Sequence, residues 1–263
     1  MSKTDILKEI VAKKKERLLL AKQQLPEEEL KNRMPGLPVA RPFIKAITKE
    51  RQISLIAEIK KASPSGGVIR ERFNHLDIAR IYQEAGVQAI SVLTEEDYFL
   101  GNISYINDVK SVTTVPILRK DFILEPYQVY ESRYFGADAI LLIADLLTQE
   151  NISGIIQLAS SLGMDCLVEV HTEKELKKVL KLKEVQLIGI NNRDLHTLEV
   201  DPKTTEKLYT LIPKGHPVVV ESALKTHQDV MFLKILGVSA VLIGTVFMES
   251  SDIKATVEEI MGW

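Results

Sequence analysis

Acidic, basic and amide residues stand at the ends of short apolar runs in this sequence. Ammonium and carboxylate groups held close together can donate and accept protons, which is general acid and base chemistry. The same groups could instead form a purely structural layer of ion pairs, because buried charge networks also occur without catalysis. Five runs end in this way: Glu58-Ile59-Lys60, Arg119-Lys120-Asp121, Glu169, Asn191-Asn192-Arg193 and Glu221-Ser222.

Alternation along the first of these runs predicts where its charged side chains point. Successive side chains of a strand face opposite sides, so Glu58 and Lys60 share one face while Ala57 and Ile59 share the other. The apolar pair suits a covering layer of helices, and we therefore expect Glu58 and Lys60 to face the interior. An unpaired charge is costly there, so these groups should pair with one another or with a ligand.

The elements that position these residues repeat along the chain. Continuous apolar runs, which are typical of parallel strands covered on both faces, alternate with amphipathic segments such as 75–85 and 229–236. A glycine at a predicted helix end recurs before a strand at Gly86, Gly136 and Gly237. No GxGxxG turn is present. We therefore predict the α/β class and a closed (β/α)8 TIM barrel with strands near 53–59, 89–93, 115–118, 139–143, 166–170, 187–190, 218–220 and 240–243.

Residues 1–50 differ from the rest and predict an α-helical N-terminal extension. Apolar residues recur at helical spacing up to Leu25-Pro26, and short helices are expected at 27–34 and 43–49. We expect this extension to pack on a barrel formed by residues 51–263, as one domain overall. The many lysines of the first helix are interpreted as a solvated face, in preference to a partner site or an active-site flank.

Composition limits the possible partners. The 263 residues carry 34 basic and 36 acidic side chains, a formal charge of -2, which disfavours nucleic acid and anionic membranes as partners. A single cysteine, Cys166, excludes an internal disulfide, and we interpret it as a packed thiol. No secretory signal or membrane span is predicted, and we expect a cytoplasmic protein that is a monomer or weak oligomer.

A phosphorylated small molecule is the expected substrate. Loops after the last two strands of barrels often bind phosphate through backbone N–H groups, and the loop 62–67 adds hydroxyl groups. Taken alone, Ser-Pro-Ser-Gly in that loop would be an ordinary turn. The predicted phosphate site comprises Lys60, Ser63, Ser222, Ala223, Gly244 and Thr245.

Five motifs in order make the prediction more specific. They are IAEIKKASPSGG at 56–67, SVLTEEDYFLG at 91–101, LRKDFI at 118–123, LVEV at 167–170 and GINNRDL at 189–195. Together they resemble indole-3-glycerol phosphate synthase of tryptophan biosynthesis, over nearly the whole chain and including the helical extension. That family closes the indole ring of 1-(2-carboxyphenylamino)-1-deoxyribulose 5-phosphate with loss of carbon dioxide and water, and it uses no metal or organic cofactor.

The resemblance implies roles for the charged residues. Lys120 would be the general acid that protonates the ribulose carbonyl, and Lys60 would hold the substrate carboxylate and is a candidate proton donor for dehydration. Glu169 would be the base. An ammonium is a useful acid if burial lowers its pKa toward the working pH, and we expect adjacent carboxylates to keep it protonated until it is needed. Glu58 and Asn191 would orient the reacting groups, and Glu221, also placed in the implied catalytic group, would lie close by.

The resemblance also implies an apolar slot for the anthranilate ring, with Arg193 as a further substrate contact. For the two leucines of the slot, an ordinary place in the barrel core is an equally good interpretation. The two phenylalanines lie in loops, where exposure would be costly unless a ligand or loop covers them. The implied slot consists of Pro64, Phe99, Phe122, Leu141 and Leu242.

One departure from the family pattern concerns the phosphate site. Members usually carry glycine after the strand-seven Glu-Ser, where this chain has Ala223, and Thr245-Val246 stands where a serine or acidic residue is common after Gly244. If the position of Ala223 needs a positive φ, its Cβ costs on the order of 1 kcal/mol. Substrate affinity would be affected more than activity.

Other residue types point away from metal chemistry. The five histidines show no paired metal-ligand spacing, and we predict no metal site. His171 follows Glu169 by two residues and is assigned a structural or supporting role.

Two alternatives to a lyase are weighed. Another phosphosugar barrel enzyme, such as phosphoribosylanthranilate isomerase, would be expected to lack the Glu58/Lys60 pair and the long extension. A barrel that only binds phosphorylated ligands would use its charges as a structural plug.

Overall fold

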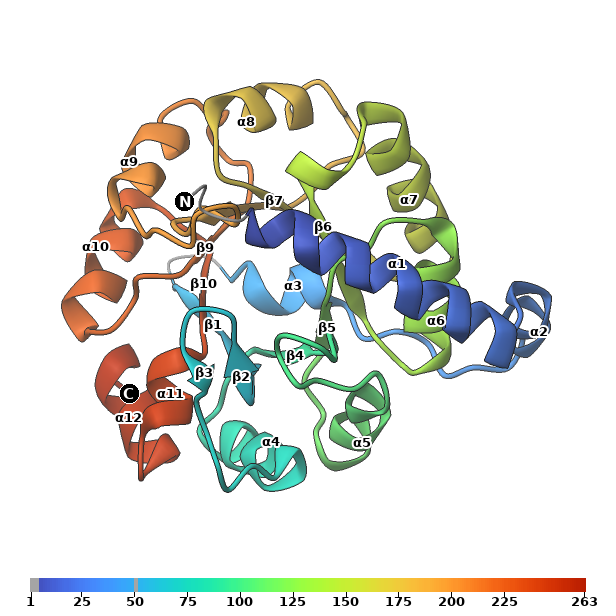
Figure 1. Cartoon of the computed structure of the whole chain (residues 1–263). Helices are drawn as coiled ribbons and strands as arrows, with labels where there is room; N and C mark the ends of the chain where they lie inside the picture. The colour runs from blue at the N-terminus through green and yellow to red at the C-terminus, as the bar shows by residue number, and fades with distance from the viewer. Residues whose placement is uncertain (1–4, 50–51) are drawn as a thin grey trace.

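The computed structural model of the chain describes residues 5–49 and 52–263. Within them, eight parallel strands form a closed barrel in which β1 pairs with both β4 and β10 (Figure 1). The predicted TIM barrel is confirmed, and its strands are β1 (Ser54–Ile59), β4 (Ala89–Leu93), β5 (Ile117–Lys120), β6 (Ala139–Ile143), β7 (Asp165–Val170), β8 (Ile188–Asn191), β9 (Val218–Glu221) and β10 (Ala240–Ile243).

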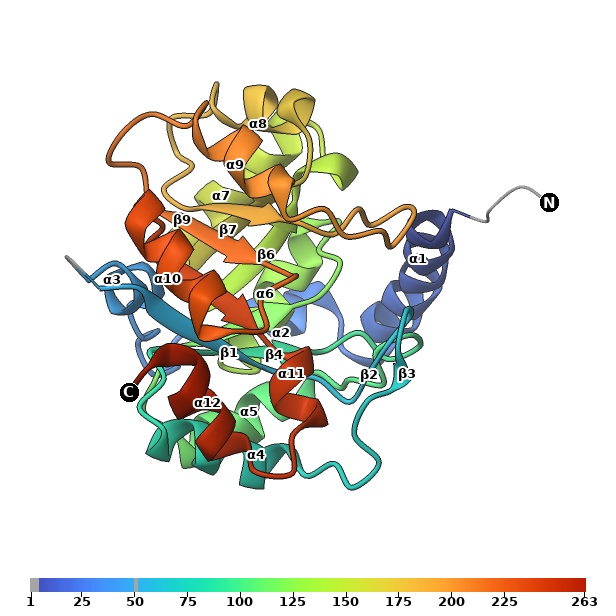
Figure 2. The ribbon, with the colours of Figure 1, turned by 90° about the vertical axis from the view of Figure 1, so that its left-hand side faces the viewer.

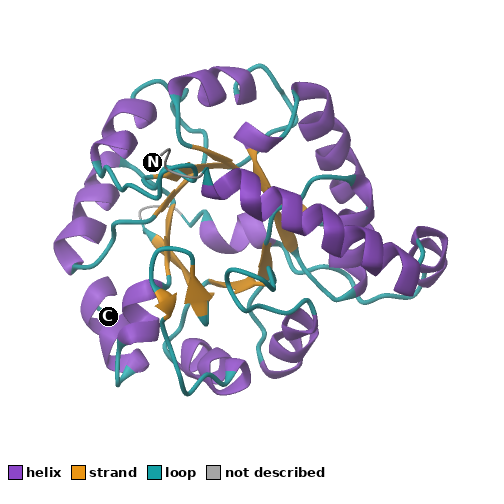
Figure 3. Cartoon of the chain, viewed as in Figure 1, coloured by secondary structure: helices purple, strands orange, loops and turns teal. Residues whose placement is uncertain are grey.

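Helices cover the outside of this barrel, as Figure 3 shows by secondary structure. Several begin at side-chain caps, such as Asn74 before α4 and the Thr226/Asp229 capping box of α10, which satisfy otherwise unpaired N–H groups. They are α4 (His75–Glu84), α5 (Ser104–Val112), α6 (Pro126–Tyr134), α7 (Gln149–Ser161), α8 (Glu173–Val179), α9 (Lys203–Tyr209), α10 (His227–Leu236), α11 (Thr245–Glu249) and α12 (Ile253–Met261). A 3-10 turn, η1 (Ala144–Leu146), and a small hairpin of β2 (Ala62–Ser63) and β3 (Gly67–Val68) complete the elements.

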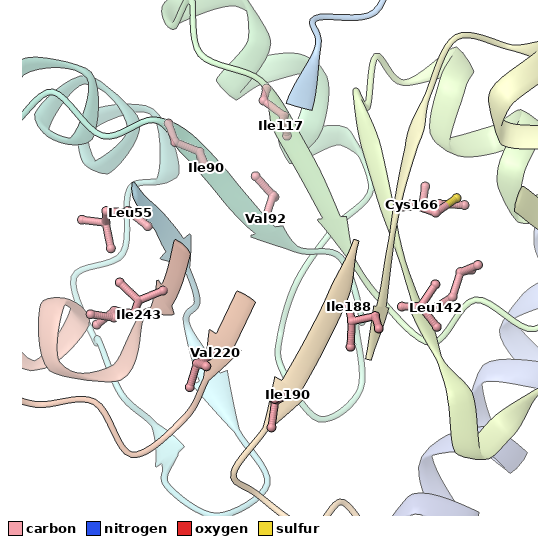
Figure 4. Close-up of a cluster of buried hydrophobic side chains, with 14 of the residues drawn as sticks. Leu55, Ile90, Val92, Ile117, Leu142, Cys166, Ile188, Ile190, Val220 and Ile243 are labelled. Carbon is pink, nitrogen blue, oxygen red and sulfur yellow. The ribbon is translucent and has the colours of Figure 1, made fainter. Parts of the chain in front are cut away.

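The larger core lies between the strands and the helices. Figure 4 shows part of it, with Leu55, Val92, Leu142 and Ile190 among the labelled side chains. Ala57 and Ile59 belong to this layer, as their alternation with charged residues predicts. So does Cys166, which is buried, and burial raises the pKa of its thiol well above the usual range. The interpretation of Cys166 as a packed thiol is confirmed.

A second core fills the inside of the barrel and joins it to the first and third helices. α1 (Ile6–Gln24) lies across the carboxyl ends of the strands and α3 (Phe43–Ile47) closes the amino ends, while α2 (Glu27–Arg33) packs beside α6 (Figures 1 and 2). The inner core accordingly includes Leu7 and Ile10 of α1 and Phe43 and Ile47 of α3. The two ends of the barrel are therefore capped by different parts of the same extension.

The predicted division between residues 1–50 and 51–263 falls on residues 50 and 51, which lie outside the described residues. Among the residues that are described, no helix is both long and apolar enough to cross a membrane.

Candidate active site

A cavity of about 560 Å³ opens at the carboxyl ends of the strands, under α1. It is a size typical of small-molecule sites, and its lining mixes apolar walls with a few charged groups. The barrel brings every predicted site residue to this one cavity: Glu58, Lys60, Ser63, Pro64, Phe99, Lys120, Phe122, Leu141, Glu169, Asn191, Arg193, Glu221, Ser222, Ala223, Leu242, Gly244 and Thr245.

Ammonium and carboxylate groups alternate across the cavity floor. Lys120 Nζ, at the end of β5, lies 3.0 Å from Glu221 Oε2 of β9 and 3.5 Å from Glu169 Oε2 of β7. Lys60 Nζ, after β1, lies 2.8 Å from Glu58 Oε2. Four strands thus supply one cluster, and the predicted inward direction of Glu58 and Lys60 is confirmed.

The amide of Asn191 orients part of this cluster. Its Nδ2 donates to Glu169 Oε1 at 3.0 Å, while its Oδ1 accepts from Ser222 Oγ at 2.8 Å and from the Arg193 backbone N–H at 2.9 Å. Because the amide can turn neither way without losing bonds, the Glu169 carboxylate is fixed toward Lys120. His171 contacts the Asn191 backbone carbonyl at 2.8 Å, which fits its expected supporting role.

Electrostatics in the cluster differ from the sequence-based expectation for Lys120. Burial lowers the pKa of its ammonium, but the carboxylates of Glu221, Glu169 and Glu58 outweigh burial, so the pKa of Lys120 lies well above its usual range. The lowering toward the working pH that would make Lys120 a readier acid does not occur, because three carboxyl groups surround one ammonium. The expectation that adjacent carboxyl groups keep Lys120 protonated is confirmed. Lys120 is therefore fully protonated before substrate arrives.

The carboxyl groups divide into two kinds. Burial tends to raise the pKa of Glu58, but Lys60 and Lys120 reverse this and leave it below its usual range. Burial, reinforced by the neighbouring Glu169, raises the pKa of Glu221 to about 8 despite Lys120. Glu221 therefore tends to hold a proton at neutral pH.

Gly244 makes room for Glu58. A Cβ at Gly244 would lie 2.7 Å from Glu58 Oε2 and 2.8 Å from Glu58 Cβ, a separation that atoms do not adopt. The glycine follows β10, which pairs with β1, and any side chain there would displace the carboxylate that pairs with Lys60. Packing against Glu58 therefore requires a glycine at position 244.

The turn after β9 has a left-handed backbone at the position where this chain has Ala223 in place of the usual glycine. Ser222 has φ 67° and Ala223 φ 62°, both in the left-handed region. The position of Ala223 therefore does have a positive φ, at a cost on the order of 1 kcal/mol for a residue with a Cβ. This turn and Gly244-Thr245 both line the cavity.

The apolar part of the cavity lies around two aromatic rings. Phe99 follows β4 and Phe122 follows β5, and their ring centroids are 6.2 Å apart at an interplanar angle of 44°. Leu141 and Leu242 belong to the inner core, as one interpretation of these leucines predicts, and they also line the cavity. Pro64 adds to this lining from the loop after β1.

The first helix contributes residues that the sequence-based prediction missed. Leu7 and Ile10 of α1 line the cavity, and Lys14 is buried, with only 3% of its surface exposed. The interpretation of the lysines of α1 as a solvated face is wrong for Lys14. Its spacing gave the signal, because Lys14 falls on the same helical face as Leu7, Ile10 and Leu18.

Comparison with known proteins identifies the family. The family model for indole-3-glycerol phosphate synthase matches residues 7–260. The chain belongs to this family. An indole-3-glycerol phosphate synthase from Acetivibrio thermocellus is 48% identical over 256 residues, which covers 97% of this chain and 98% of the relative. Another, from Caldanaerobacter subterraneus subsp. tengcongensis, is 48% identical over 98% of this chain and 99% of the relative.

Solved structures outside the indole-3-glycerol phosphate synthase family share its fold. A 3-hexulose-6-phosphate synthase matches with a TM-score of 0.63 at 14% identity, over 80% of this chain and 99% of the other. A mutant tryptophan synthase α-subunit from Pyrococcus furiosus matches with a TM-score of 0.62 at 16% identity, over 80% and 98% of the two chains. At these identities the likeness shows the barrel alone.

Proposed function

We propose that the chain is a carbon-carbon lyase that converts 1-(2-carboxyphenylamino)-1-deoxyribulose 5-phosphate to indole-3-glycerol phosphate, carbon dioxide and water in tryptophan biosynthesis. One observation carries this proposal beyond family membership: the Lys120 ammonium lies between two buried carboxyl groups, in the same cavity as the Lys60/Glu58 pair. Groups that can donate protons and groups that can accept them therefore surround one cavity that is large enough for a small-molecule substrate.

In the first step, the ring carbon that bears the carboxylate attacks the ribulose carbonyl carbon. A carbon-carbon bond forms, the carbonyl π pair moves to oxygen, and Lys120 supplies the proton that makes this oxygen a hydroxyl. The ring nitrogen carries the positive charge of the intermediate, which the Glu169 carboxylate stabilises. The bond to the carboxylate then breaks, carbon dioxide leaves, and its electron pair restores the aromatic ring.

In the second step, the new hydroxyl leaves as water. An acid protonates it, for which Lys60 is our candidate, and a base removes a proton from the neighbouring carbon attached to nitrogen, for which Glu169 is our candidate. The electron pair of that C–H bond becomes the indole double bond. Each such proton transfer is worth about 10²–10⁴ in rate.

We propose that the two ends of the substrate bind to different parts of the cavity. We assign the aromatic ring to the slot of Pro64, Phe99 and Phe122, with the two leucines beneath it. We assign the phosphate to the turn after β9 and the start of α11, where backbone N–H groups at a helix N-terminus favour an anion. The phosphate group comprises Lys60, Ser63, Ser222, Ala223, Gly244 and Thr245, with Arg193 as a further substrate contact.

A turnover assay tests the proposal. The carboxyphenylamino ribulose phosphate is incubated with wild-type protein and with Lys120→Ala, and product is followed by indole fluorescence. We expect wild type to give product and Lys120→Ala to be slower by at least about 10²-fold, with equal circular dichroism spectra. No product from wild type would refute the lyase. Equal rates would refute the role of Lys120.

Three further features of the protein stay predictions. The helical extension of residues 1–50 and the barrel of 51–263 are proposed to unfold as one domain, which calorimetry would show as a single transition. The cytoplasmic location and the monomeric or weakly oligomeric state are open to cell fractionation and light scattering.

A further inference from the structure

Lys14 is the buried lysine of a helix whose neighbouring lysines face solvent. Its side chain is 3% exposed, whereas that of Lys13 is 45% exposed and pairs within its own helix with Glu16. Lys14 Nζ instead lies 2.8 Å from Asp121 Oδ1 and 3.1 Å from Glu96 Oε2. One ammonium group of α1 therefore joins two loops of the barrel.

The first of these carboxylates directly precedes Phe122. Asp121 Oδ1 also accepts the backbone N–H of Phe122 at 2.8 Å, and Asp121 Oδ2 accepts from Thr94 Oγ1 at 2.6 Å and from Arg119 Nη2 at 2.9 Å. The side chain of Asp121 is fully buried. Its bonds fix the backbone that carries the Phe122 ring, and Lys14 is the partner that comes from outside the barrel.

The second carboxylate belongs to the loop that carries Phe99. In that loop, Glu95 accepts the backbone N–H groups of Asp97, Tyr98 and Phe99 at 3.0, 2.8 and 3.0 Å. These hydrogen bonds hold the segment from Glu95 to Phe99 in one conformation. A displacement of Glu96 would therefore also move Phe99. The Phe99 ring of this loop lies 6.2 Å from the Phe122 ring, centroid to centroid.

We propose that Lys14 is a positioning residue for the aromatic slot, because its ammonium bridges the loops that carry Phe99 and Phe122. This inference rests on the proposed function, in which the slot receives the anthranilate ring. Lys14 touches none of the reacting atoms. It sets the spacing of the two rings and holds α1, with its lining residues Leu7 and Ile10, over the same part of the cavity.

The charge that makes this bridge persists at working pH. Burial opposes the charged form, but Asp121 and Glu96 outweigh burial and raise the pKa of Lys14. Lys14→Met keeps the length and apolar stem of the side chain and removes the charge. Asp121 retains Arg119 as a countercharge, and Glu96, whose side chain is 36% exposed, retains water. We therefore expect the variant to fold.

Binding of substrate fragments tests the inference. Anthranilate probes the aromatic slot and glycerol 3-phosphate probes the phosphate site, each by calorimetric titration of wild type, Lys14→Met, Lys14→Arg and the matched surface variant Lys13→Met. We expect Lys14→Met to bind anthranilate roughly tenfold more weakly and glycerol 3-phosphate within about twofold of wild type. Lys14→Arg should recover most of the loss, and Lys13→Met should match wild type.

Turnover adds a second readout. If the ring is positioned by Lys14, Lys14→Met should raise KM by about the same factor as the anthranilate Kd and change kcat less. Unchanged anthranilate affinity, or equal losses for both fragments, would overturn the inference. The proposed function fails separately, through absence of product from wild type, because the fragment titrations require no turnover.

Discussion

The two ends of the barrel both bury carboxylates beneath a helix of the extension, yet only one end has the geometry for chemistry. At the amino end, under α3, Asp138 accepts the backbone N–H groups of Arg41 at 2.6 Å and Ile117 at 2.8 Å and pairs with Lys110. Asp165 accepts the N–H of Ile44 at 2.9 Å. These carboxylates tie α3 to the strands, and their bonds are short and directed.

At the carboxyl end, the charged groups are held but not fully satisfied. Lys120 and Glu169 are 3.5 Å apart, and Glu221 Oε1 is buried without a hydrogen-bond partner among the described residues. A cavity of about 560 Å³ adjoins them. At the amino end, by contrast, the ion pair of Lys110 with the buried Asp138 lies away from the cavity. Buried charge alone therefore does not indicate a reacting group; unmet bonding capacity beside a cavity does.

The largest expected effect comes from neutralising a carboxylate at the mouth. Glu169→Gln should reduce kcat by about 10²–10⁴-fold, because the base and the charge that stabilises the intermediate are both lost. Its thermal stability should change little, since Asn191 still has an acceptor on residue 169. Steady-state kinetics and a thermal melt measure both quantities. A lower melting temperature with an unchanged kcat would mean instead that the charged groups at the carboxyl ends of the strands have a structural role only.

The next effect is a dependence of stability on pH. A carboxyl group titrates near pH 4.3 in an unfolded chain, whereas the pKa of Glu221 is raised to about 8 by burial and by Glu169. Between these values the folded protein holds an extra proton, so stability falls as pH rises and levels off above about 8. For one proton the slope is at most about 1.4 kcal/mol per pH unit.

Glu221→Gln removes this term. Its advantage in unfolding free energy over wild type should therefore grow from pH 5 to pH 8, as measured by urea denaturation at each pH. A difference between Glu221→Gln and wild type that stays constant from pH 5 to pH 8 would mean that Glu221 does not carry the proton.

At the amino end, the matched neutralisation should have the opposite result. Asp138→Asn replaces an acceptor by an N–H₂ group that faces existing donors, so we expect a loss of about 1–3 kcal/mol in unfolding free energy. The kcat of the folded enzyme should equal that of wild type, because Asp138 lies at the end of the barrel away from the cavity. A large fall in kcat without destabilisation would erase the distinction between the two ends.

The periodic features of the fold were predictable from the sequence. Strands buried on both faces, such as Ala139–Ile143, read as continuous apolar runs, and the alternation of Glu58 and Lys60 with Ala57 and Ile59 gave their directions. In a closed parallel barrel, the carboxyl ends of all the strands lie at the same end of the barrel. The site residues could therefore be grouped without knowing any distance.

Features that depend on contacts between distant segments were not predictable. Lys14 meets Asp121 and Glu96 only because α1 crosses the mouth, and nothing local to α1 specifies that path. The direction of the Lys120 pKa shift could not be predicted for the same reason, because it depends on how many carboxyl groups three other strands bring to Lys120. The sequence predicts which face of a helix or strand is buried more readily than it predicts the residues that this face contacts.

The smallest expected effect is on stability and concerns one residue at the carboxyl end of the barrel, Ala223. Ala223 already has the left-handed φ of 62°, so its Cβ affects stability and not the path of the backbone. Ala223→Gly relieves about 1 kcal/mol of strain but adds freedom to the unfolded chain, and we expect a net gain below about 1 kcal/mol. KM should change less than about twofold. A tenfold fall in KM would show instead that the Cβ of Ala223 obstructs the phosphate. Substrate would then bind more weakly with alanine at this position than with glycine.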